Sequence, residues 1–139
     1  MINVLLVASD ERIRERLRLA LERLESGDPA DEVRFLEATN GNDALVIAEA
    51  QRPDLTVVEV GATPYGAFGL TRDLKSSPET ARPVIVVLER PQDDWLARWS
   101  GADAMVYRPV DPFALAQVAR RLVEERRGVA PQLEQEAAS

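Results

Sequence analysis

Residues 55–60 read LTVVEV, an apolar and largely β-branched run in which the acidic Glu59 stands one position before the end. A Pro-Asp pair precedes the run and a glycine follows it, which are typical boundaries of a strand. The runs INVLLV at 2–7 and PVIVVL at 83–88 are equally apolar. Near-continuous apolar runs of this length are typical of strands buried on both faces of a parallel sheet.

Segments with helical periodicity lie between these runs. After the first strand, apolar residues recur every three or four positions among arginines and glutamates, which predicts an amphipathic helix. Its apolar face comprises Ile13, Leu17, Leu21 and Leu24. We predict further helices from Asn40-Gly41 to Pro53, over Leu70 to Lys75, over Pro91 to Ser100 and from Asp111-Pro112 onward. The apolar face of the last helix comprises Phe113, Leu115, Val118, Ala119, Leu122 and Val123.

Two weaker strands complete the pattern. Val33 to Glu37 alternates in polarity and is expected at a sheet edge, and Ala104 to Tyr107 forms a fifth strand. Five strand–helix units with short connections predict a three-layer α/β fold, a doubly wound parallel sheet with helices on both faces. Ligands of such sheets bind at the carboxyl ends of the strands. A glycine-rich phosphate loop is absent from the sequence, which argues against a nucleotide-binding member of this class.

Composition narrows the function classes. The chain has 139 residues, which favours one domain over residues 1–127, followed by a tail at 128–139 that we expect to be mobile. It has no cysteine and no histidine, so thiolate and imidazole chemistry are excluded. The net charge of −7 disfavours nucleic acid as a partner. The longest apolar run is too short to span a membrane and no basic leader precedes the first strand, so we expect a cytoplasmic protein.

Four segments resemble the receiver domain of bacterial response regulators, over about residues 2–126. They are VLLVASDERIRERLRLALE at 4–22, ATNGNDALVIAEAQRPDLTVVEV at 38–60, PVIVVL at 83–88, and GADAMVYRPVDPFALAQVARRL at 101–122. The resemblance implies a flavodoxin-like sheet with strand order 2-1-3-4-5 and a role in two-component signal transduction.

The resemblance also shows that the working positions of the family carry other residue types here. The acids that hold Mg²⁺ fall at Ala8 and Ser9, the phosphoacceptor at Glu59, the hydroxyl after the fourth strand at Leu88, the switch aromatic at Met105, and the lysine at Arg108. Because Mg²⁺ needs several oxygen ligands, we expect no metal and no cofactor. Without the metal, the charge on a transferring phosphoryl group lacks its main stabiliser, so we predict a degenerate pseudo-receiver that is not an enzyme.

Three interpretations of Glu59 remain open. It is a mimic of the phosphorylated aspartate, a partner of Arg108, or a solvated carboxylate at the edge of a loop. Arginine is a planar and permanently charged donor that suits carboxylates, which favours the pair. The mimic is disfavoured because Leu88 and Met105 lack the groups that would transmit its effect.

Two tryptophans four positions apart suggest a binding surface. Trp95 and Trp99 share one face of their helix, and comparison with the family pattern predicts that Trp95 belongs to the core and Trp99 is an exposed anchor. Tyr107 and Val110 are expected near Trp99. The arginine-rich first helix is interpreted as a mostly solvated, ion-paired face. Its arginines are Arg12, Arg14, Arg16, Arg18 and Arg23.

The favoured function is an atypical stand-alone signalling module that binds a protein partner of its pathway without aspartyl phosphorylation. A homodimer through the helix at 91–100, the strand at 104–107 and the last helix is a further expectation from the resemblance. The alternatives are a response regulator that still accepts a phosphoryl group or is switched by a small ligand, and a structural subunit of a larger complex.

Overall fold

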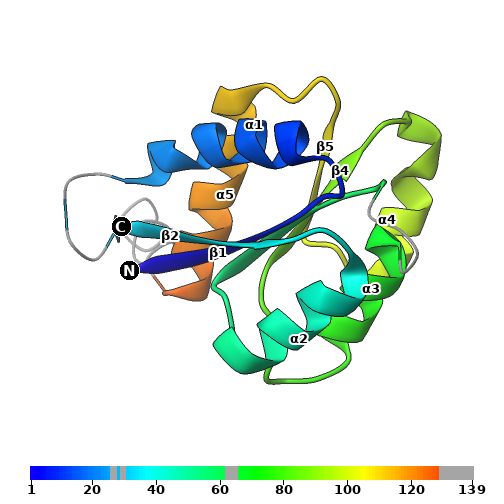
Figure 1. The fold of residues 1–139 in the computed structure, drawn as a ribbon, viewed down its shortest axis with the longest axis horizontal. Helices are drawn as coiled ribbons and strands as arrows, with labels where there is room; N and C mark the ends of the chain where they lie inside the picture. The colour runs from blue at the N-terminus through cyan, green and yellow to red at the C-terminus, as the bar shows by residue number, and fades with distance from the viewer. Residues whose placement is uncertain (26–27, 29–30, 62–65, 129–139) are drawn as a thin grey trace, which may run out of the picture.

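A computed structural model describes residues 1–25, 28, 31–61 and 66–128 of the chain and contains a single five-stranded sheet (Figure 1). The strands are β1 (Ile2–Val7), β2 (Val33–Ala38), β3 (Leu55–Glu59), β4 (Val84–Leu88) and β5 (Ala104–Tyr107). All neighbouring strands run parallel in the order β2-β1-β3-β4-β5, which confirms the predicted topology and the edge position of the second strand. The predicted tail at 128–139 lies outside the described residues except for Gly128.

Helices connect the strands at the predicted places. They are α1 (Glu11–Leu21) with a 3-10 turn η1 (Glu22–Leu24), α2 (Gly41–Gln51), α3 (Ala67–Lys75), a 3-10 turn η3 (Pro91–Asp93) leading into α4 (Asp94–Ser100), and α5 (Pro112–Arg126). Side chains of Asp10, Asn40 and Asp111 accept backbone N–H groups at the starts of α1, α2 and α5. The third helix begins at Ala67, three residues before the predicted start, because burial of Ala67 and Leu70 outweighs the low helix propensity of the glycine between them.

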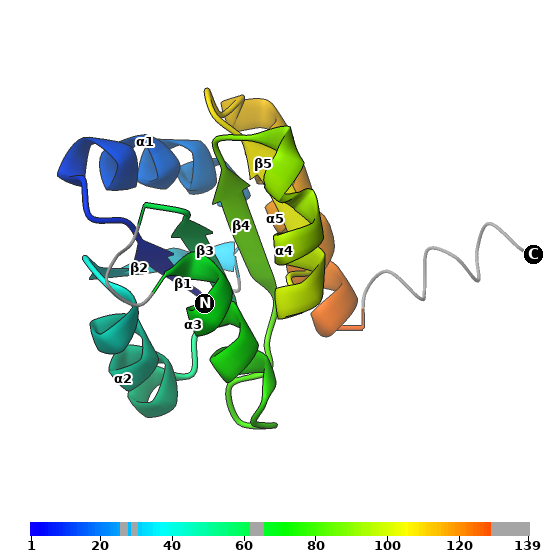
Figure 2. The ribbon, with the colours of Figure 1, turned by 90° about the vertical axis from the view of Figure 1, so that its right-hand side faces the viewer.

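Two apolar layers enclose the sheet, as Figures 1 and 2 show. Successive strand residues point to opposite faces, so Val4 and Leu6 pack with α1 and α5, whereas Leu5 and Val7 pack with α2, α3 and α4. All four side chains are fully buried. Among the described residues, no helix is long and apolar enough to cross a membrane.

Two predicted core residues are in fact exposed. Trp95 is 64% exposed because the short α4 buries its opposite face through the small residues Ala97 and Ser100. Phe113 is 70% exposed in the first turn of α5. The guanidinium carbon of Arg23 lies 4.8 Å from the centroid of its ring, in a cation–π contact. Periodicity correctly predicted which residues share a helix face, but neither the family pattern for Trp95 nor periodicity for Phe113 predicted that the side chain is exposed.

Candidate functional site

The carboxyl ends of the three central strands bring the predicted acid-pocket residues together. In the sheet register, Val7 of β1 lies beside Val58 of β3, and Glu59 lies beside Val87 of β4. Ala8 is fully buried directly after β1, and its N–H donates to the carbonyl of Ala38 at 3.1 Å. Ser9 is exposed, and its hydroxyl lies 3.5 Å from the carbonyl oxygen of Gly61. The predicted positions thus form one site, although their donor groups differ from those of the family.

Glu59 is buried at the centre of this site. Its residue is only 2% exposed, and its side chain folds over Gly61. A Cβ atom added to Gly61 would lie 2.9 Å from Oε2 of Glu59 and 3.3 Å from Oε1, closer than ordinary contact. The absence of a side chain at position 61 therefore leaves the space that the Glu59 carboxylate occupies.

Arg108 reaches across from the end of β5 to this buried carboxylate. Its Nη1 atom lies 3.3 Å from Oε1 of Glu59 and 2.5 Å from Oε1 of Glu89. The predicted Glu59–Arg108 pair is therefore present, with a second, exposed carboxylate on the same cation. A buried carboxylate is strongly unfavourable without a partner, so Arg108 is the main compensation for burying Glu59. The contact of Glu89 with Arg108 was not predicted from the sequence, although Glu89 directly follows Leu88 at the end of β4.

The donor set of this site does not fit a magnesium ion. Ala8 supplies no side-chain oxygen, Leu88 is a fully buried hydrocarbon, and the carboxylate of Glu59 is engaged by a cation. Magnesium prefers octahedral oxygen coordination, usually through carboxylates and water. In the part of the chain that the structure describes, no group of three or more acidic side chains gathers as a metal site.

Met105, the predicted switch position, and Tyr107 of β5 both lie towards the α4 side of the sheet. Met105 pairs with Val86 and packs against the core layer under α2, α3 and α4. The hydroxyl of Tyr107 donates a short hydrogen bond to Oδ1 of Asp94, at the start of α4. That hydrogen bond raises the pKa of Tyr107 above its ordinary value, because ionisation of the phenol would remove the donated proton.

The three predicted interface residues do not form one surface. Trp99 is 54% exposed, as predicted, and lies under the guanidinium of Arg72 from α3, whose carbon is 4.3 Å from the ring centroid. Tyr107 bonds to the other end of α4, and Val110 packs against the core layer next to α1 and α5. We define the aromatic patch as Trp95, Trp99 and Arg72. The sequence analysis predicted neither the contact of Arg72 with Trp99 nor the exposure of Trp95. The small residues Ala97 and Ser100 on the opposite face of the helix could have indicated that Trp95 is exposed.

Comparisons with known proteins identify relatives among bacterial signalling proteins. No family model matches the chain. An uncharacterized response regulatory protein of Mycobacterium tuberculosis is 33% identical over 124 residues, which cover 88% of this chain and 91% of the relative. The KDP operon transcriptional regulatory protein KdpE of Escherichia coli is 32% identical over 124 residues, but these cover only 50% of that protein.

Solved structures of bacterial signalling proteins have a similar fold. The signal receiver domain of a signal transduction histidine kinase from Syntrophus aciditrophicus superimposes with a TM-score of 0.78 at 25% identity, over 90% of this chain and 92% of that domain. The chemotaxis protein CheY4 of Vibrio cholerae has a TM-score of 0.74 at 19% identity, over 88% of this chain and 98% of that one, which supports the fold alone.

Proposed function

This chain belongs to the response regulator family as a receiver domain of two-component signalling, and we propose that it acts by binding a protein partner without accepting a phosphoryl group. The observation that carries this proposal is the buried Glu59 carboxylate held by Arg108, with Ala8 beside it in place of an acid. The proposal also places the protein in the cytoplasm, without a cofactor, a catalytic activity or a nucleic-acid partner.

The geometry around Glu59 opposes phosphoryl transfer in three ways. The carboxylate is 2% exposed, so a phosphodonor has little access to its oxygens. Its Oε1 atom already forms an ion pair with Arg108, and the positive charge of Arg108 lowers the nucleophilicity of the carboxylate. Transfer of a phosphoryl group is accelerated mainly by positioning and by cations that neutralise charge, and the donor set here does not fit the metal.

The aromatic patch is the surface that best supports a protein partner. Trp95 and Trp99 expose large rings on one side of α4, and Arg72 stacks on Trp99. Tryptophan and arginine are the residue types most enriched among interface hot spots. The patch lies towards α3, so the surface proposed for a partner is the α3–α4 side. Self-association through α4, β5 and α5 is the other mode of association that the family resemblance suggests.

Intact-mass measurement after incubation with Mg²⁺ and acetyl phosphate tests the central claim. We expect no stable phosphoryl adduct on the wild-type protein, because the donor set does not fit the metal and the Glu59 carboxylate is buried. A receiver domain that keeps the family acids is the positive control for the donor. An adduct that forms on the wild type and disappears in Glu59→Gln would refute the proposal and support the phosphoryl-accepting alternative.

A further inference from the structure

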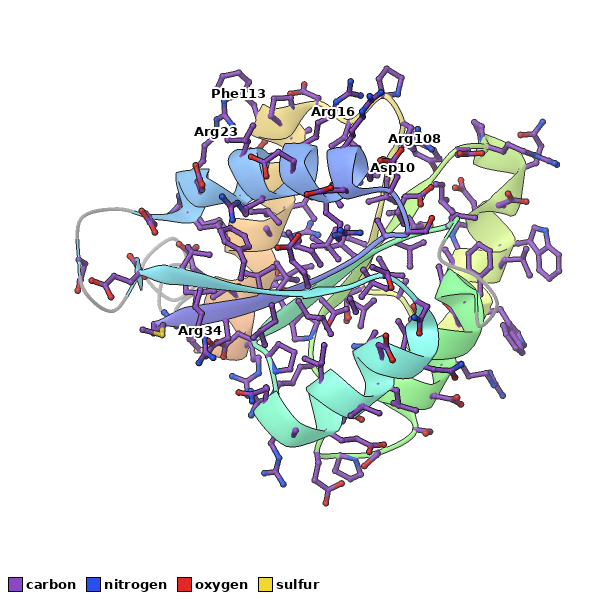
Figure 3. The ribbon with its side chains drawn as sticks, viewed as in Figure 1. Asp10, Arg16, Arg23, Arg34, Arg108 and Phe113 are labelled. Atoms are coloured by element: carbon purple, nitrogen blue, oxygen red, sulfur yellow. The ribbon has the colours of Figure 1, made fainter. Side chains whose placement is uncertain are left out.

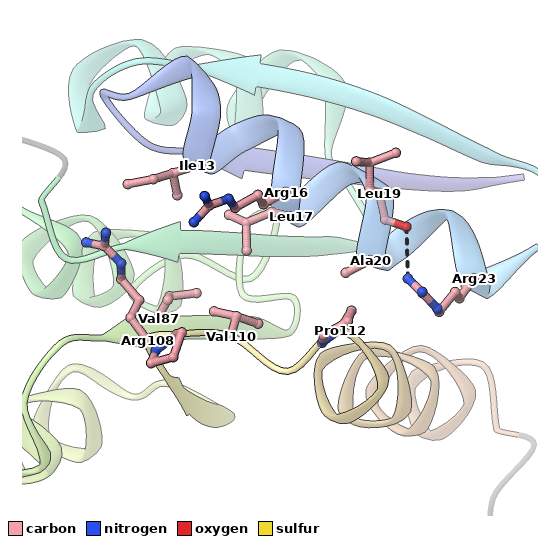
Figure 4. A pocket seen from close by; sticks show the side chains of 11 residues that line it. Ile13, Arg16, Leu17, Leu19, Ala20, Arg23, Val87, Arg108, Val110 and Pro112 are labelled. Carbon is pink, nitrogen blue, oxygen red and sulfur yellow. Dashed lines mark hydrogen bonds between the residues drawn. The ribbon is translucent and has the colours of Figure 1, made fainter.

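A groove separates α1 from the segment that joins β5 to α5, on the side of the sheet away from the aromatic patch (Figure 4). Its volume is about 400 Å³, within the range of roughly 300 to 1,000 Å³ that is typical of small-molecule sites. Both walls come from distant parts of the sequence, since Leu17 and Ala20 lie on α1 whereas Val110 and Pro112 follow β5.

The lining of the groove is largely apolar. Leu17, Ala20 and Val87 are buried at its floor, and Ile13 and Val110 are half-buried beside them. Such a surface gains free energy when an apolar ligand removes it from water. None of these side chains offers a hydrogen bond, so polar recognition has to come from the rim.

The rim of the groove is cationic. Figure 4 shows Arg16 between Arg108 at one end and Arg23 at the other. Arg108 forms ion pairs with Glu59 and Glu89. In contrast, no carboxylate of the described residues forms an ion pair with Arg16 or Arg23.

Two arginines of α1 outside the groove do have carboxylate partners. Arg14 and Arg18 pair with Glu37 and Glu15, at 3.2 Å and 3.8 Å. The expectation of an ion-paired helix therefore holds for these two arginines and fails for Arg12, Arg16 and Arg23, for which the described residues supply no carboxylate. The nearby carboxylate of Asp111 is turned to the backbone of α5, where it accepts the N–H groups of Phe113 and Ala114. Two of these unpaired arginines, Arg16 and Arg23, lie on the rim of one apolar groove in a chain of net charge −7.

One contact limits the length of an occupant. Arg23 of η1, directly after α1, stacks on the ring of Phe113 of α5, so this cation–π contact joins the two walls at one end (Figure 3). Arg23 also donates to the carbonyl of Leu19 at 3.3 Å, which keeps its side chain over the groove. A joined end favours a short molecule over a partner helix that would have to extend past it.

We propose that this groove binds a small organic anion that has an elongated apolar body and a single carboxylate. The apolar body lies on the floor formed by Leu17, Ala20 and Val110, and the carboxylate is bound by the guanidinium of Arg16. The inference goes beyond the proposed function. The groove shares no residue with the aromatic patch and shares only Arg108 with the Glu59 site.

Octanoate, 1-octanol and acetate are the probes for this site, because they separate the contributions of the chain and the charge. In amide NMR titrations of the full chain, octanoate is expected to shift the signals of residues 13–20 and of Arg108, Val110 and Asp111 saturably. Octanol is expected to bind about tenfold more weakly and acetate not measurably, because the site needs both the apolar body and a charge-assisted contact. Equal binding of octanoate and octanol, or shifts confined to other residues, would overturn the proposal.

Matched variants test whether Arg16 supplies the positive charge that binds the carboxylate. Arg16→Gln is expected to weaken octanoate binding about tenfold and to leave octanol binding unchanged. Arg34→Gln is the control, since Arg34 is an exposed arginine on β2 away from the groove and also has no carboxylate partner among the described residues (Figure 3). Ala20→Phe fills the floor and should abolish binding of both probes, with thermal unfolding as the check of folding. An Arg16→Gln affinity equal to that of Arg34→Gln would also overturn the proposal.

Discussion

Nη1 of Arg108 lies 3.3 Å from Oε1 of Glu59, whose residue is 2% exposed, whereas Arg108 itself remains 36% exposed on its side chain. The pair therefore joins a buried anion to a cation that still contacts water. Water screens the charge of Arg108 and weakens the pair. Among the described residues, however, no other cationic side chain forms an ion pair with the Glu59 carboxylate. The stability of the strand ends should depend on this one side chain.

Replacing Arg108 by methionine is expected to destabilise the fold by about 2 kcal/mol, because it leaves the Glu59 carboxylate buried without its cation. Urea unfolding followed by circular dichroism measures the change. Glu89→Gln is the control, since it removes only the exposed partner of the same cation and should cost less than about 0.5 kcal/mol. Equal effects of the two substitutions would mean that the buried contact does not matter. The double variant Glu59→Gln/Arg108→Met should recover most of the loss.

Gly61→Ala is expected to destabilise the protein by about 1 kcal/mol, because the new Cβ atom would lie 2.9 Å from Oε2 of Glu59. The same substitution in a Glu59→Ala background removes the opposing atoms and should add little further cost. Unfolding free energies of the four proteins form a thermodynamic cycle. A cost of Gly61→Ala that is the same in both backgrounds would show that the clash with Glu59 is not its cause.

Tyr107 is expected to ionise above the ordinary tyrosine pKa of about 10, because its hydroxyl donates to Asp94. The raised pKa in the folded state means that any stabilisation from this bond is complete below the unfolded pKa. It is lost as the pH rises through the folded pKa. Phenolate absorbance in a Tyr65→Phe background, which leaves one tyrosine, measures the titration. Asp94→Asn should move the midpoint back towards the ordinary value, and an unmoved midpoint would contradict the assignment.

Trp99→Ala and Trp95→Ala are each expected to weaken binding of a purified partner by about 2 kcal/mol, roughly thirtyfold in the dissociation constant, if the aromatic patch is the docking surface. Cross-linking in native lysate followed by mass spectrometry identifies that partner, and calorimetry measures its affinity. Val46→Ala is the control, because Val46 is a similarly exposed apolar residue on α2. Unchanged affinity in both tryptophan variants would remove the patch from the proposed function.

The prediction was accurate wherever local pattern is enough. Apolar runs such as 55–60 become central strands because residues buried on both faces must be apolar throughout. The edge strand at 33–38 alternates because only part of it is covered. The strand order followed from the resemblance and the position of Glu59 at a strand end from the pattern at 55–60, and the sheet confirms both.

The amino-acid sequence alone therefore determined the elements and their order along the chain. Only the tertiary structure decided that Trp95 and Phe113 are exposed and that no carboxylate among the described residues pairs with Arg16. Periodicity identifies the residues that share one face of a helix, but exposure and pairing depend on which neighbouring element covers that face. Those neighbours come from distant parts of the chain, so their positions are fixed by packing across the whole sheet.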